Sequence, residues 1–174
     1  IAVSGGGGLT LGSPNNLTYS GTITGNGWLT LGDDGNVYSL NLSGINGLTG
    51  GTVTIANNSN YVRFKTTAMG NGNTDWVFNN TTAGRTTIDF ASGTMALGSL
   101  GGNGVLQGNV AGTMNVTLQV GGNNNPSIFS GVIHDNPAGT GSISLTKNGS
   151  GTLRLTGACD YSGATVVNGG GVTV

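Results

Sequence analysis

The sequence predicts an all-β fold, and within that class a β-solenoid made of stacked coils. Three observations support this prediction: short segments in which apolar and polar residues alternate, turn-forming residues at the ends of those segments, and approximate internal repeats. Helical patterns are nearly absent, because no segment places apolar residues at positions i, i+3, i+4 and i+7. The chain is therefore expected to consist of strands and turns.

The alternating segments recur along the whole chain. They are three to five residues long and lie at 9–11, 28–31, 52–55, 61–64, 87–90, 116–120 and 153–155. Gly, Asn, Asp or Ser bounds each of them, and these residues accept turn and left-handed conformations. Each segment is expected to be one strand of the solenoid.

Internal repeats favour a solenoid over a β-sandwich, whose strands have a similar spacing. Three elements recur, at intervals typical of coils of about 20–30 residues. An aromatic-Ser-Gly element occurs at 19–21, 129–131 and 161–163, a Gly-bounded Leu-x-Leu element at 27–32 and 151–157, and a Gly-Gly element with a β-branched strand at 50–55 and 170–174.

Composition limits the partners. The 174 residues suit one domain, and we expect residues 1–174 to be a single β-helix module excised from a longer secreted protein, because both ends interrupt the pattern. A net charge of -1 with few scattered charges argues against nucleic acid. No apolar run approaches the length of a transmembrane helix, so no membrane partner is expected. We expect a monomer without intrachain disulfides, since Cys159 is the only cysteine.

The last quarter of the chain resembles a known repeat. The order "GSGTLRLTG" followed by "YSGATVVNGGG", within residues 129–174, is similar to the autotransporter-associated β-strand repeat, and it departs from that pattern at Cys159-Asp160. The resemblance implies a right-handed parallel β-helix and a bacterial protein that is secreted or lies at the cell surface. It leaves function open, because the repeat occurs in adhesin passengers and in polysaccharide-degrading enzymes.

Candidate catalytic residues are few. The six Asp residues are far apart in sequence, and those at 33–36 and 134–137 lie in segments that are typical of turns. His134 has no evident nucleophile partner and is expected to be a solvated turn residue. Cys159 is expected to fill space at a repeat corner. We therefore predict no enzyme and no cofactor, with calcium at "DDGN" (33–36) as a weak alternative that lacks EF-hand spacing.

A carbohydrate-binding face has more support. Strand alternation places Trp28, Tyr61 and Arg63 outside, while the phase around Trp76 depends on whether Val77 or Phe78 faces the core. Exposed aromatic rings stack on sugars, and neighbouring polar groups bond to sugar hydroxyls. The predicted sugar-binding residues are Trp28, Tyr61, Arg63, Lys65, Asp75, Trp76 and Arg85.

Two functions remain from the sequence. The main prediction is a non-catalytic module that binds a plant cell-wall polysaccharide, most readily a xylan-type glycan, beside an appended glycoside hydrolase domain; in outline it resembles β-helical xylan-binding modules. The alternative is a structural passenger stalk of an autotransporter adhesin. A β-helical lyase or hydrolase and an ice-binding Thr face are weaker, because acids are few and Thr ladders such as 22–24 and 52–54 lack a constant period.

Overall fold

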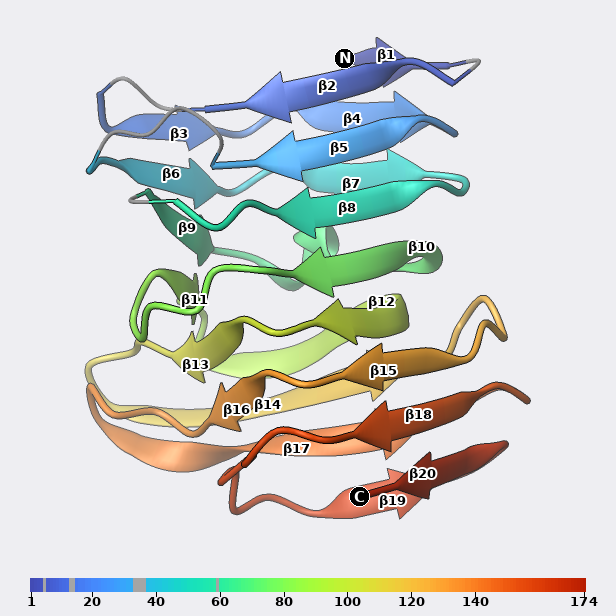
Figure 1. The fold of residues 1–174 in the computed structure, drawn as a ribbon. Coiled ribbons are helices and arrows are strands. Elements are labelled where there is room, and N and C mark those ends of the chain that lie inside the picture. The colour runs from blue at the N-terminus through green and yellow to red at the C-terminus, as the bar shows by residue number, and fades with distance from the viewer. Residues whose placement is uncertain (5, 13–14, 33–36, 59) are drawn as a thin grey trace.

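The protein is a column of stacked parallel coils (Figure 1). The computed structural model describes residues 1–174 except 5, 13–14, 33–36 and 59. Strands of successive coils pair in parallel at every described step, from β1 with β4 to β18 with β20. This pairing excludes a β-sandwich and confirms the predicted all-β, right-handed parallel β-helix, which has about seven turns.

The strands lie on three faces that follow one another around each coil. The first face holds β1 (Ala2–Val3), β4 (Thr22–Gly25), β7 (Ile45–Leu48), the first part of β12 (Ser92–Gly102), β14 (Thr113–Val120), β17 (Thr140–Lys147) and β19 (Thr165–Val167). The second holds β2 (Gly8–Leu11), β5 (Trp28–Leu31), β8 (Thr52–Ile55), β10 (Asn71–Phe78), the end of β12, β15 (Ser127–Phe129), β18 (Thr152–Leu155) and β20 (Gly171–Thr173). The third holds β3 (Leu17–Tyr19), β6 (Ser39–Leu42), β9 (Tyr61–Phe64), β11 (Thr86–Ile88), β13 (Val105–Gly108) and β16 (Val132–His134).

A 3₁₀ helix, η1 (Thr67–Met69), lies between β7 and β12, where a first-face strand would otherwise be expected. Asn71 bridges part of this interruption, because its Nδ2 donates to the carbonyl oxygens of Asn46 at 2.9 Å and Leu48 at 2.7 Å. Among the described residues, no helix is long and apolar enough to span a membrane.

The core runs along the inside of the column and follows from the period of two in each strand. On the second face, the parallel register stacks one inward residue of each coil on the next, in the order Leu9, Leu29, Val53, Trp76 and Leu100. A second column, two residues further along, contains Leu31, Ile55 and Phe78. Full burial stabilises the fold by about 1.5–3 kcal/mol for each large aliphatic side chain.

Three aromatic rings fill the middle of the core. Trp76 lies 5.8 Å from Phe64 in an edge-to-face arrangement and 5.9 Å from Phe78 in a stacked one. Its indole Nε1 donates to the Asn71 carbonyl oxygen at 3.2 Å, so its polar atom is satisfied inside the protein. The phase that the sequence left open is therefore the one with Phe78 and Trp76 both inward.

Gly102 shows why glycine is required where a strand turns a corner against the coil above. Its φ is +95°, and a Cβ placed there would lie 2.2 Å from the Phe78 carbonyl oxygen. We expect Gly102→Ala to lower the free energy of unfolding by at least about 2 kcal/mol, through strain and through loss of the close approach. Gly50→Ala is the control, because a Cβ at Gly50 would meet nothing within 4 Å. Equal urea midpoints for the two variants would contradict this account.

Candidate functional site

Charge gathers on the third face of an otherwise nearly uncharged column. Three of the five basic and three of the six acidic residues lie on its strands or directly beside them: Arg63, Lys65, Arg85, Asp89, Asp135 and Asp160. The strands that carry or flank them are β9, β11 and β16. This face is therefore the candidate functional site.

Parallel register arranges outward side chains of this face in one column. Arg63 of β9 aligns with Thr87 of β11, Thr87 with Gln107 of β13, and Gln107 with His134 of β16. The Asp160 backbone N–H then donates to the Ile133 carbonyl oxygen at 3.1 Å, which extends the stack by one coil. Neighbouring positions are about 4.8 Å apart, the spacing between paired strands.

The upper part of this face is a cationic cluster, defined as Tyr61, Arg63, Lys65 and Arg85. The guanidinium carbon of Arg85 lies 4.1 Å from the centroid of the Tyr61 ring, and that of Arg63 lies 5.2 Å from it. Both cations are thus held at one aromatic ring by cation–π attraction.

Asp89 anchors the cationic cluster from beneath. Its side chain is only 4% exposed, and its Oδ2 lies 2.6 Å from Lys65 Nζ and 3.6 Å from Arg63 Nη1. Thr87 Oγ1 donates to its Oδ1 at 2.6 Å, and Asn109 Nδ2 donates to both oxygens at 3.3 Å. The carboxylate is therefore fully engaged in positioning the cations.

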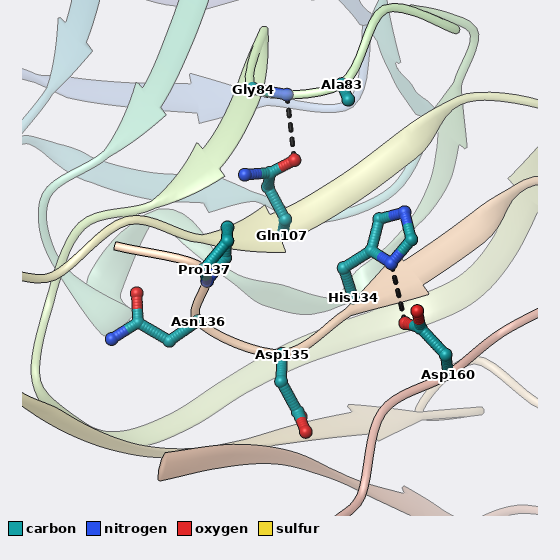
Figure 2. A pocket seen from close by; sticks show the side chains of 8 residues that line it. All are labelled: Ala83, Gly84, Gln107, His134, Asp135, Asn136, Pro137 and Asp160. Carbon is teal, nitrogen blue, oxygen red and sulfur yellow. Dashed lines mark hydrogen bonds and ion pairs between the residues drawn. The ribbon is translucent and has the colours of Figure 1, made fainter. Parts of the chain in front are cut away.

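The lower part is a hollow of about 560 Å³ (Figure 2). It is lined by Ala83, Gly84, Gln107, His134, Asp135, Asn136, Pro137 and Asp160. Gln107 Oε1 accepts a hydrogen bond from the Gly84 backbone N–H at 2.8 Å, which fixes one wall. His134 Nδ1 lies 2.6 Å from Asp160 Oδ1 on the opposite side. His134 is therefore a strand residue with a carboxylate partner, rather than the solvated turn residue that the sequence predicts.

The hollow does not assemble a recognisable catalytic set within the described residues. Asp135 points away from His134 in Figure 2, and its carboxylate accepts backbone N–H bonds from Ile143 at 2.7 Å and Ser162 at 2.9 Å. Burial raises the pKa of Asp135, but bonds from Ser162 and Ile143 outweigh this and lower it. Asp135 thus acts as an ionised brace. The described part of the chain also contains no group of three His, Cys, Asp or Glu residues that could hold a metal ion.

Cys159 is half-buried beside the hollow, and its Sγ lies 3.8 Å from the Gly131 carbonyl oxygen. Burial raises the pKa of its thiol, the Asp160 charge raises it further, and a backbone hydrogen bond at Ile133 opposes both. We expect iodoacetamide to alkylate native Cys159 at pH 7.5 at least tenfold more slowly than the urea-unfolded chain, since the thiolate is the nucleophile. Equal rates by mass spectrometry would show that the thiol is neither shielded nor suppressed.

The predicted sugar-binding residues do not form one face. Trp28, Asp75 and Trp76 belong to second-face strands, whereas Tyr61 and the three cations belong to the third face. Trp28 is 47% exposed, as expected, but Trp76 is completely buried. The placement of Trp76 on a ligand was wrong, because the alternating period of β10 puts it on the same side as Phe78.

Asp75 is already saturated by the protein. Its Oδ1 accepts hydrogen bonds from Ser99 Oγ at 2.6 Å, Asn123 Nδ2 at 2.7 Å and Asn125 Nδ2 at 3.1 Å. Burial raises the pKa of the Asp75 carboxyl, but the three side-chain hydrogen bonds outweigh it and leave the pKa below its ordinary value. The carboxylate is a structural acceptor. The alternative calcium segment, residues 33–36, lies outside the described residues.

Sequence reasoning missed Asp89, Gln107 and Asn109. Lys65 and Asp89 are 24 residues apart, which is also the separation of the paired residues Arg63 and Thr87. This coil length is the signal that could have joined them. It is not constant, because the offset from Val105 to its partner Val132 is 27 residues.

Comparison with known proteins addresses the family. Residues 145–174 match the model of the passenger-associated transport repeat. This match confirms the predicted repeat. The chain is also similar to the adhesin BmaC autotransporter of Brucella suis biovar 1 (strain 1330), with 33% identity over 159 residues. The alignment covers 88% of this chain and 4% of that adhesin, so the chain spans a small part of its relative's length. No solved structure gave a significant match.

These findings correct the main functional prediction. The repeat and the relative point to an autotransporter passenger, which was the alternative, and the prediction of a xylan-binding module from a plant-polysaccharide-degrading enzyme is wrong. The buried Trp76 and the division of the remaining residues between two faces agree with that correction. The predicted localisation is confirmed: this is a secreted or cell-surface bacterial protein.

Proposed function

We propose that this chain is a structural stalk segment of an autotransporter adhesin, and that it works without catalysing a reaction. The observation that carries the proposal is the uninterrupted parallel pairing from β1 to β20, which makes the segment a column with a continuous core. The transport repeat at 145–174 and the similarity to an adhesin support the same function.

A column of this kind sets distance and direction. Coils rise by about 4.8 Å each, so seven turns extend the column by about 34 Å. Each coil is held by its neighbours through backbone hydrogen bonds and the shared core, which resists bending more than a flexible linker does. A stalk segment therefore separates an adhesive region from the cell surface by a fixed length.

Replacing the segment within the full-length surface protein tests this proposal. One strain carries an in-frame deletion of the segment, and a second carries an unrelated uncharged β-solenoid with the same number of coils in its place. We expect the replacement to retain adhesion to host cells and the deletion to shorten the exposed rod by about 34 Å in electron micrographs. Loss of adhesion in the replacement strain, at equal surface display, would overturn the stalk function.

A further inference from the structure

We propose that the cationic cluster on the third face is a binding site for anionic groups of the sulfate or phosphate ester class. This site is separate from the stalk function, which depends on the core and not on surface charge. Three of the five Lys and Arg residues of the chain form the cluster, on two adjacent coils.

The charge of the cluster is not balanced locally. Arg63, Lys65 and Arg85 together face one carboxylate, Asp89, which leaves a net charge of +2. The Asp89 side chain is almost completely buried, whereas those of Arg63 and Lys65 are 29% and 35% exposed. Solvent therefore meets the cations, and the compensating charge lies beneath them.

Other acids of the same face are too distant to neutralise the cluster. Asp160 lies four strand positions from Arg63 along the column, a separation of about 19 Å. The Debye length at physiological ionic strength is about 8 Å, so this carboxylate is largely screened from the cluster.

The cluster is also preorganised. Tyr61 holds the Arg85 and Arg63 guanidinium groups at 4.1 and 5.2 Å from its ring centroid, and Asp89 holds Lys65 at 2.6 Å. A guanidinium presents a planar set of N–H donors that matches tetrahedral oxyanions, and stacking reduces the side-chain entropy lost on binding. Sulfate and phosphate esters offer the matching acceptor oxygens.

Binding of dextran sulfate and of long-chain polyphosphate, measured by calorimetry in 50 mM NaCl, tests the site. These two probes separate a sulfate source from a phosphate source, and unsulfated dextran tests whether the sugar itself is recognised. We expect the wild type to bind at least one polyanion, with affinity falling as NaCl rises to 200 mM, and to ignore unsulfated dextran.

Matched variants localise the binding. Arg63→Gln combined with Arg85→Gln is expected to weaken the polyanion affinity at least tenfold. Arg154→Gln is the control, because Arg154 is an outward arginine of β18 on the second face, away from the cluster. Circular dichroism melts establish that each variant is folded. The proposal is overturned if the wild type binds neither polyanion, if unsulfated dextran binds as tightly, or if Arg154→Gln weakens binding as much as the double variant.

Discussion

Trp76→Ala is expected to lower the free energy of unfolding by about 3–5 kcal/mol. The indole is completely buried, contacts Phe64 and Phe78, and stacks in register between Val53 and Leu100. Removing it leaves a cavity in a column whose backbone cannot close up, because the strand spacing on either side is fixed by hydrogen bonds. Urea unfolding followed by circular dichroism measures the loss.

The second tryptophan supplies the control for this experiment. Trp28 is 47% exposed and lies over Gly8 on the outside of β5. We expect Trp28→Ala to change the free energy of unfolding by no more than about 1 kcal/mol. A similar loss in both variants would contradict the assignment of Trp76 to the core and Trp28 to the surface.

Asp75→Ala is expected to lower the free energy of unfolding by about 2 kcal/mol at pH 7, because Ser99, Asn123 and Asn125 all lose a charged acceptor. The folded-state pKa of Asp75 is lowered, so its contribution is present above the ordinary aspartate pKa and is lost as pH falls through the lowered value. The difference between wild type and variant should therefore shrink below about pH 4.

Asp160→Ala is the control for Asp75→Ala. The Asp160 side chain is 62% exposed, and its ion pair with His134 lies at the surface, where such pairs contribute about 0–1 kcal/mol. Urea midpoints at pH 7 and pH 3 for both variants decide the matter. A difference between wild type and Asp75→Ala that stays constant across this range would show that the carboxylate charge does not carry the effect.

Local alternation was sufficient to predict most of the core. In 28–31 and 61–64 the large apolar residues share one parity, so the inward residues Leu29, Leu31, Val62 and Phe64 follow directly from the strand period. In 74–78 both parities carry an apolar residue beside an aromatic one, and local sequence cannot choose between them. The register with β8, which pairs Trp76 with Val53, decides the phase.

The candidate site was less predictable, because it depends on which residues of different coils align. Tyr61, Arg63, Lys65 and Arg85 were found from their exposure and charge. Asp89, which organises them, could only be placed once the coil length was known. Coil offsets range from 19 residues, between Thr152 and Gly171, to 27, between Val105 and Val132, so no single period finds such partners.

The segment between β14 and β15 has a consequence for how the column comes apart. Asn123 and Asn125 of this segment bind Asp75, which lies two coils away, past the coil that contains β12. A stack held only by adjacent coils can fray from either end, one coil at a time. Here a fraying front that reaches this crossing must release three coils together, so the middle of the rod acts as a clamp that arrests unzipping.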